Sequence, residues 1–235
     1  MKMVQRLFQT SLGKKYLMAL TGLGLFVFVL GHLLGNLQIF LGREAINSYG
    51  AFLQSKPGMV WLVRGLLLAT VSMHLWAAIT LTRENRAARP VAYSDQYTPV
   101  ASSYASRTMV MSGLIVAAFI IYHLLHFTVQ TPAVNLTGQN FLALTDAQGR
   151  HDIFAVMITG FRQPVVALFY VIAMALLCLH LSHGVSALTQ SLGLKTEALG
   201  TSLDRFAVWI AWAIFAGYSS IPIAVLLGYG KAAVK

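Results

Sequence analysis

Apolar residues occur in five long runs that short polar segments separate. The runs cover residues 16–41, 59–81, 109–129, 165–188 and 206–229. A membrane-spanning helix needs about 20 consecutive apolar residues, and each run reaches that length. The pattern therefore predicts an all-α membrane protein, a bundle of five transmembrane helices that forms a single membrane domain over residues 1–235.

The composition excludes several classes of protein. Of the 235 residues, 57% are hydrophobic and 10% are charged, whereas soluble domains carry roughly 25% charged residues. The net charge of +10 does not indicate a nucleic-acid partner, because the basic residues flank the apolar runs and form no arginine-rich pattern. The single cysteine, Cys178, excludes a disulfide framework and a metal site built from cysteines.

Lysine and arginine in the loops predict the orientation of the chain, because cytoplasmic loops carry an excess of them. With the N-terminus in the cytoplasm and the C-terminus outside, the cytoplasmic segments hold more basic residues than the external ones. The cytoplasmic set is Lys2, Arg6, Lys14, Lys15, Arg83, Arg86, Arg89, Arg107, Lys195 and Arg205, and the external set is Arg43, Lys56, Arg150, Arg162, Lys231 and Lys235. In the long external stretch, residues 151–161 are expected to form a short interfacial helix.

Histidines supply the candidate chemistry. Each of the first four apolar runs holds at least one, and the fifth holds none. Ionisable side chains are costly inside a membrane and are functional candidates by default, although a histidine that only bridges two helices is the simpler alternative. The six histidines within the apolar runs are His32, His74, His123, His126, His180 and His183.

The depths of these histidines form two levels. A helix rises 1.5 Å per residue, so His32 and His123 both lie about 24 Å from the cytoplasmic ends of their helices. His74 and His180 lie about 12–15 Å from the same side. Two histidines that face each other across a bundle can hold a haem iron from both sides, which gives an electron carrier without an open coordination position. We therefore expect the bundle to enclose two haems.

Periodicity does not choose between neighbouring histidines. His123 and His126 are three residues apart and share a helix face, and the same holds for His180 and His183. His32-Leu33-Leu34 recurs as His123-Leu124-Leu125, and His74-Leu75 recurs as His180-Leu181, which hints at a duplicated two-helix unit. On this basis we favour His123 and His180 as ligands and place His126 and His183 in the surroundings of the haems.

Small and charged neighbours add to this interpretation. Gly31 and Gly35 flank His32 and would let a flat macrocycle approach the helix, although such spacing also serves plain helix packing. Arg64 is expected near the level of His32 and His123, where a haem propionate would neutralise it; the alternative is that it extends to the outer interface. All seven carboxylates fall at the ends of the runs or in loops, which disfavours a proton pump based on carboxylates.

Several segments resemble the five-helix, single-chain dihaem cytochrome b subunits that anchor succinate dehydrogenases and fumarate reductases, the succinate:quinone oxidoreductases, to the membrane. The resemblance covers the first four runs in order, and the fifth run matches only generally. It rests on GKKYLMALTGLGLFVF with HLLGNLQIF, MHLWAAI followed by RAARP and Tyr93, YHLLHF, and HLSHGVSALTQSLG. Some members carry a glutamate two residues before the fourth-helix ligand, where this chain has Cys178.

The resemblance implies a function and a set of partners. It implies two b haems, with His32 and His123 as ligands of the distal one and His74 and His180 as ligands of the proximal one. It also implies a flavoprotein subunit and an iron-sulfur subunit on the cytoplasmic side of a prokaryotic cell (inner) membrane. Electrons would pass between these subunits and a quinone, either menaquinone or ubiquinone, for which Asn36, Gln38 and Arg64 are candidate contacts.

Two other functions compete with this one. A respiratory cytochrome b subunit of the nitrate reductase gamma type would concentrate its ligands on fewer helices. A haem-free transporter or assembly anchor would use the histidines only to bridge helices. The latter predicts no haem absorbance and tolerance of His32→Ala and His74→Ala.

Overall fold

The computed structural model describes residues 2–88 and 103–234, with no account of the side chains of residues 2–4. Within these residues it is helical, and its only β-pairing is an isolated bridge between Thr145 and His151. Pro90 and Tyr93, which carry part of the resemblance described above, lie outside the described residues. In the described part, five helical stretches are long and apolar enough to cross a membrane, so the predicted all-α membrane fold with five spanning helices is confirmed.

Four of the spanning stretches are longer than the apolar runs that predicted them, and the third, Met109–Thr128, is one residue shorter than its run. The five stretches are α2 (Ser11–Leu37), which continues into the 3-10 turn η1 (Gln38–Leu41), α4 (Pro57–Ala87), α6 (Met109–His123), which continues into the π-helical segment η2 (Leu124–Thr128), α9 (Pro164–Ser191) and α10 (Gly200–Leu226). The added residues are mostly polar. A helix continues beyond the hydrocarbon layer as long as its backbone hydrogen bonds continue. Pro57 and Pro164 begin two of the helices, at a position where a missing N–H costs nothing.

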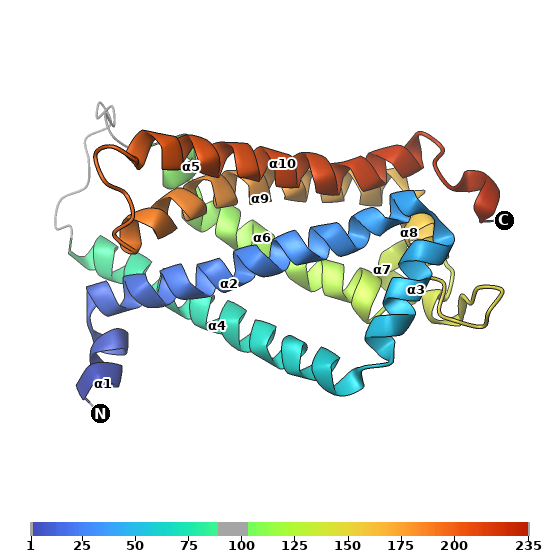
Figure 1. Ribbon diagram of the computed structural model, residues 1–235, viewed down its shortest axis with the longest axis horizontal. Helices are drawn as coiled ribbons and strands as arrows, with labels where there is room; N and C mark the ends of the chain where they lie inside the picture. Colours follow the sequence, from blue (N-terminus) through green and yellow to red (C-terminus); the bar gives the residue numbers. More distant parts are fainter. Residues whose placement is uncertain (1, 89–102, 235) are drawn as a thin grey trace.

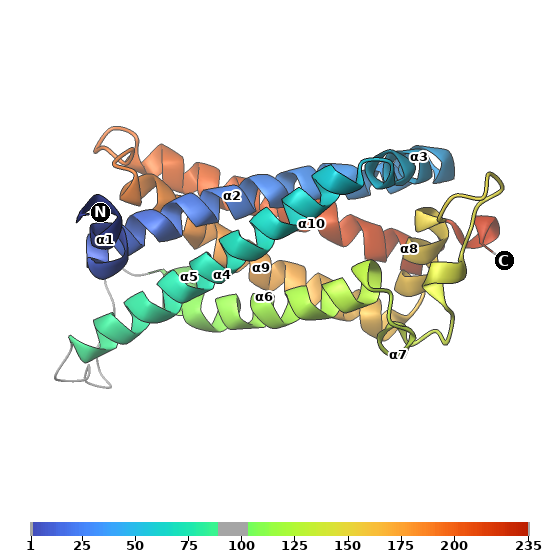
Figure 2. The ribbon, with the colours of Figure 1, turned by 90° about the horizontal axis from the view of Figure 1, so that it is seen from below.

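The bundle is elongated, and the two termini lie at its opposite ends (Figure 1). The view in Figure 2 shows α4 crossing obliquely over α2, with α6 running along the lower side of the bundle. Shorter helices cap the end that holds the C-terminus: α3 (Arg43–Gln54), α7 (Pro132–Asn135), the 3-10 turn η3 (Phe141–Ala143), α8 (Ile153–Phe161) and the 3-10 turn η4 (Lys231–Ala233). At the N-terminal end lie α1 (Lys2–Gln9) and α5 (Tyr104–Arg107).

Two contacts fix the N-terminal end. The chain turns sharply between α1 and α2, and a Cβ at Gly13 would lie only 2.5 Å from the carbonyl oxygen of Arg6, so only glycine fits there. The next residue, Lys14, is 4% exposed and pairs with Glu84 of α4. A buried lysine needs such a partner, so this pair ties α2 to α4 at the level where both helices leave the apolar layer.

The main cluster of buried side chains lies toward the C-terminal end. It joins η1 and α3 to α8, α9 and the last turns of α10. Every residue from Phe154 to Phe161 is buried. The helix predicted at residues 151–161 therefore exists, but it packs inside this end of the bundle rather than lying on a membrane surface, because both of its faces are apolar.

A buried polar cluster holds α3 against the segment that precedes α8. Asn47 is fully buried, and its amide donates to Asp146 Oδ2 (3.1 Å) and to Asp152 Oδ1 (3.0 Å). Its carbonyl oxygen accepts from the backbone N–H of Phe154 (3.0 Å). Arg150 extends this cluster from Asp146 to Glu44. It bonds both carboxylate oxygens of Glu44 at 2.7 and 2.9 Å and lowers the pKa of Glu44 to about 2, so the pair stays ionised at neutral pH.

We expect Asn47→Ala to lower the melting temperature of the protein in detergent. The substitution leaves the buried N–H of Phe154 without its acceptor, which costs about 1–3 kcal/mol, and it removes one of the two donors to Asp152 Oδ1. The measurement is thermal unfolding followed by circular dichroism. Ser48→Ala, at the adjacent exposed position, is the control, and equal melting temperatures for the two variants would contradict this account of Asn47.

Candidate functional site: paired histidines inside the bundle

Six histidines project from four of the spanning helices. His32 lies in α2, His74 in α4 and His123 at the end of α6. His126 follows in the π-helical segment, and the remaining two lie in α9. π-Helical turns inside longer helices occur frequently at functional sites. Here the wider turn lies directly after one of the histidines singled out by the sequence.

His32 and His123 lie side by side toward the C-terminal half of the bundle. Their ring centroids are 5.7 Å apart, and the ring planes are nearly perpendicular, at 82°. An aromatic ring from the preceding turn of each helix stacks on each histidine: Phe28 on His32, with centroids 5.3 Å apart, and Phe119 on His123, at 5.8 Å. The helix-rise argument expected these two histidines at one level, and the structure brings them together.

A tyrosine of α9 links His123 to its neighbour His126. The Tyr170 hydroxyl lies 3.3 Å from His123 Nδ1 and 3.0 Å from His126 Nδ1. Both histidines therefore do share a face, as their spacing indicates. Sequence reasoning did not find Tyr170, because nothing in the chain distinguishes it from other tyrosines in apolar runs.

The surroundings of His126 differ from those of His123. His126 is fully buried, and no hydrogen-bond partner reaches its Nε2 among the described residues. The ring of Phe127 lies 4.0 Å away between centroids. A Cβ placed on Gly160 of α8 would lie 3.1 Å from His126 Nε2, so backbone closes off this nitrogen. His126 has no room beside its free nitrogen for a flat macrocycle, whereas His123 faces another histidine.

His74 and His180, the second pair that helix rise predicts, lie in the half of the bundle that holds the N-terminus, and the ring of each approaches a hydroxyl on a neighbouring helix. His74 Nδ1 is 3.1 Å from the Thr21 hydroxyl of α2, and His180 Nδ1 is 3.4 Å from the Ser112 hydroxyl of α6. His183, one turn beyond His180, lies instead within electrostatic range of Lys195 and Asp204 at the end of the bundle.

The predicted surroundings of His32 are only partly near it. Gly31 has no atom within 4 Å of where its Cβ would lie, so the space beside it is open. Gly35 is covered by Tyr49 of α3, whose Cε1 would be 3.0 Å from a Cβ there. Arg64 is exposed on α4, with its guanidinium 4.9 Å from the centre of the Trp61 ring. This contact is of the kind expected for an arginine that extends toward the outer interface.

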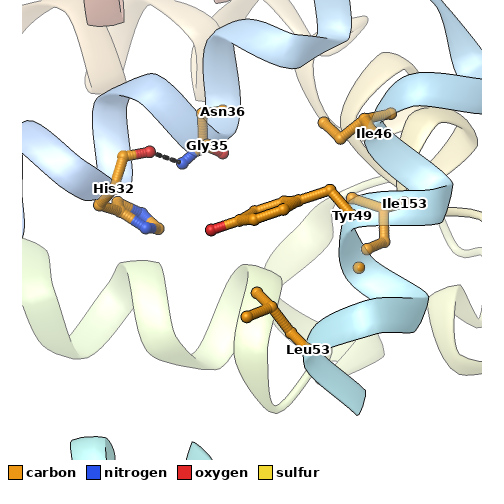
Figure 3. A pocket seen from close by; sticks show the side chains of 8 residues that line it. His32, Gly35, Asn36, Ile46, Tyr49, Leu53 and Ile153 are labelled. Atoms are coloured by element: carbon orange, nitrogen blue, oxygen red, sulfur yellow. Dashed lines mark hydrogen bonds between the residues drawn. The ribbon is translucent and has the colours of Figure 1, made fainter. Parts of the chain in front are cut away.

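A small open pocket lies next to His32, between α2 and α3, with a volume of about 160 Å³. Figure 3 shows the Tyr49 hydroxyl directed toward the His32 ring, and the Asn36 amide bonded to the backbone oxygen of His32. Of the three predicted quinone contacts only Asn36 lines this pocket; Gln38 and Arg64 do not. The lining residues are His32, Gly35, Asn36, Ile46, Tyr49, Gly50, Leu53 and Ile153.

Sequence reasoning missed Tyr49 because it lies in a segment between two spans. A signal was nevertheless present: residues 43–54 are too polar to cross a membrane and directly follow the helix that carries His32. A polar helix that follows the His32 helix without crossing the membrane is expected to pack over the end of the bundle that is nearest to His32.

Comparison with protein-family models, curated proteins and solved structures found no match to this chain. The fold and the site therefore define its class from the structure alone. It is a multi-pass helical membrane protein with five candidate spanning helices in the described residues and with a contact between His32 and His123 inside the bundle.

Proposed function

We propose that this chain is the membrane-anchor cytochrome b subunit of a succinate:quinone oxidoreductase, holding two b haems between paired histidines. The observation that carries the proposal is the arrangement of His32 with His123 and of His74 with His180 on four different helices. Two imidazoles from different helices are the ligand set of a six-coordinate haem. Bridging histidines of a transporter have no reason to meet in two pairs.

The residues around both pairs fit a haem. Ligand histidines usually bond through their second nitrogen to a neighbouring group, which fixes the ring and its tautomer. His74, His180 and His123 each have an Nδ1 next to a hydroxyl, at 3.1, 3.4 and 3.3 Å. This arrangement leaves Nε2 as the nitrogen available to iron. When bound, haem supplies reversible one-electron transfer.

The surroundings of the neighbouring histidines support His123 as the ligand in this proposal. His126 has its Nε2 against the backbone of Gly160, so its role in the proposal is to pack and to share the Tyr170 hydroxyl. Near the other pair, His180 rests against α6, and His183 lies closer to the charged end of the bundle. We therefore keep His126 and His183 as neighbours of the haems rather than ligands.

We further propose that a quinone binds in the pocket beside His32. A quinone headgroup needs donors for its two carbonyl oxygens and apolar walls, together with access from lipid. Besides His32, the polar side chains of the pocket are Tyr49 and Asn36, and Ile46, Leu53 and Ile153 are its apolar walls. Arg64 has no part in this site because it lies outside the pocket and is exposed.

The dicarboxylate chemistry belongs to partner subunits in this proposal. The chain has one cysteine, so it supplies no iron-sulfur cluster. A cytoplasmic iron-sulfur subunit, itself bound to a flavoprotein subunit, would exchange electrons with the His74–His180 level. Electrons would then pass to the His32–His123 level and to quinone. The membrane is that of a prokaryotic cell, with the N-terminal end of the bundle in the cytoplasm.

The proposal is tested by an optical spectrum and a haem count on the detergent-purified complex. We expect a reduced-minus-oxidised spectrum of b-type haem, two haems for each copy of this chain, and reduction of both by succinate. Absence of haem from folded, partner-bound protein would overturn the proposal in favour of a transporter or anchor. Haem that succinate does not reduce would point to a different respiratory cytochrome b subunit.

We expect Tyr49→Phe to raise the KM for quinone roughly tenfold, because one hydrogen bond to the headgroup is worth about 1.5 kcal/mol. The haem content is expected to stay unchanged. The measurement is succinate-driven reduction of a soluble quinone analogue by the complex. Tyr16→Phe, which removes a hydroxyl at the far end of α2, is the matched control. A KM that is equal in the two variants would remove Tyr49 from the quinone site.

A further inference from the structure

Each histidine of the His74–His180 pair rests on a hydroxyl residue and a glycine that are adjacent in the sequence of a neighbouring helix. In α2 these residues are Thr21 and Gly22, and in α6 they are Ser112 and Gly113. We call each of these two-residue sets a seat. Nothing in the reasoning from sequence singled out any of the four residues.

The first seat holds His74 of α4. The Thr21 hydroxyl oxygen lies 3.1 Å from His74 Nδ1. A Cβ placed on Gly22 would lie 3.4 Å from His74 Cε1 and 3.8 Å from Nδ1. The edge of the imidazole that carries Nδ1 and Cε1 therefore lies over the backbone of α2 at Gly22, where an added Cβ would be in van der Waals contact with the ring.

The second seat holds His180 of α9 in the same way. The Ser112 hydroxyl oxygen lies 3.4 Å from His180 Nδ1, and Ser112 is 1% exposed. A Cβ placed on Gly113 would lie 3.2 Å from His180 Cε1 and 3.6 Å from Nδ1. The same two ring atoms face the same two kinds of residue at both seats.

Each of the two hydroxyl groups also lies near a carbonyl oxygen of its own helix. The Thr21 hydroxyl is 2.7 Å from the carbonyl oxygen of Leu17, and the Ser112 hydroxyl is 3.2 Å from that of Met109. A hydroxyl has a single proton, so a hydroxyl that donates to a carbonyl oxygen accepts from the histidine through a lone pair. Bonds in this direction place the proton of each histidine on Nδ1 and the lone pair on Nε2.

The two seats occupy equivalent places in a repeated unit. Thr21 precedes His32 by eleven residues in α2, and Ser112 precedes His123 by the same eleven residues in α6. In both cases the histidine in the seat comes from the next spanning helix along the chain. The recurrence of His-Leu-Leu and His-Leu is thus accompanied by a recurrence of contacts. A duplicated two-helix unit accounts for both seats.

We propose that the two seats fix His74 and His180 as Nδ1–H tautomers and present their Nε2 atoms to a common ligand in the bundle. Thr21 and Ser112 are positioning residues, which act on the ligand only through the histidines. This inference rests on the proposed function, in which that ligand is the haem iron of the His74–His180 level. A hydrogen bond from Nδ1–H to an acceptor also raises the basicity of a ligating imidazole.

The test is Thr21→Val in the intact complex, with Thr21→Ser as the conservative rescue. Valine keeps the shape but removes the hydroxyl, which leaves the backbone of Met18 as the other hydrogen-bonding group beside His74. We expect the haem of this level to leave the protein ~10-fold more readily. Its midpoint potential should rise, since a less basic ligand stabilises ferric iron less. The haem of the other level is the internal control. Haem transfer to apomyoglobin and a potentiometric titration measure the two effects.

Thr70→Val is the matched control on α4, one turn before His74, because its hydroxyl donates only to the carbonyl of Leu66 in its own helix. Wild-type behaviour of Thr21→Ser and Thr70→Val beside an altered Thr21→Val supports the proposal. Ser112→Ala tests the second seat independently and decides the matter if Thr21→Val does not assemble.

Failure of this inference is distinguishable from failure of the proposed function. Two haems in the wild-type complex, with unchanged haem transfer and potential in both Thr21→Val and Ser112→Ala, would overturn the seats alone. A wild-type complex without haem would overturn the proposed function and with it the ligand named here.

Discussion

Replacing His74 with alanine is expected to remove one of the two haems and leave the other in place. Alanine has no nitrogen that could bind the haem iron, and a bis-histidine site needs both of its ligands. His32 and His123 contact each other through different helices and do not depend on His74. The measurement is haem per polypeptide in the purified complex, together with the potentiometric titration, from which one of two components should vanish.

The control for this variant is His151→Ala. His151 lies in the segment before α8, where its ring meets the side chain of Gln130 at 2.9 Å, far along the chain from either pair. The His151→Ala variant should retain both haems. Retention of both haems in His74→Ala would reject the assignment of His74 as a ligand, and loss of both would show that the two levels are not independent.

His123→Ala and His126→Ala are expected to differ sharply although the two residues share one hydrogen-bonding partner. His123→Ala should lose the haem of the His32 level. His126→Ala should keep both haems but unfold more easily, because it leaves a cavity beside Tyr170 and Phe127 in a fully buried place. Cavities of this kind cost about 2–4 kcal/mol.

Haem content and thermal unfolding, measured on the same preparations, separate the two roles. Tyr170→Phe gives a further comparison, since it removes the shared hydroxyl and neither imidazole. It should keep both haems with a shifted potential for one of them. The opposite pattern, with haem lost from His126→Ala and retained in His123→Ala, would exchange the roles of the two histidines.

The five spanning helices could be predicted from sequence because their signal is local. Each run is apolar over its whole length, and no partner is needed to recognise it. The ends of the helices could not be predicted in this way. For α4, the helix continues through Arg83 and Glu84 to Ala87, where polar residues leave the apolar layer without breaking the backbone pattern.

The pairing of levels also followed from local information, since helix rise converts sequence position into depth. The contacts that distinguish His123 from His126 could not be predicted from local information. Whether His126 has space beside its Nε2 depends on Gly160, in a helix that begins far along the chain. That α8 packs inside the bundle depends on tertiary packing, which hydropathy does not report.

The pocket shows the same limit. Asn36 lies in the helix that carries His32 and could be proposed from its position, whereas Tyr49 comes from α3, which folds back over the end of the bundle. Arg64 illustrates the opposite error. Depth alone placed it near His32, but a residue on a helix also has a direction, and the structure shows its side chain against Trp61 on the exposed face.

The composition of the buried cluster has a consequence for biosynthesis. Its members include Ile39 and Ile46, which leave the ribosome early, and Ile221 and Val225, which leave it among the last, with Tyr229 and Val234 packed against them. The cluster therefore cannot close until translation has almost ended. Until then the first spans lie in the membrane with the side chains of the future cluster unpacked. A stop codon that removed only the last residues would therefore disrupt the main buried cluster of the fold.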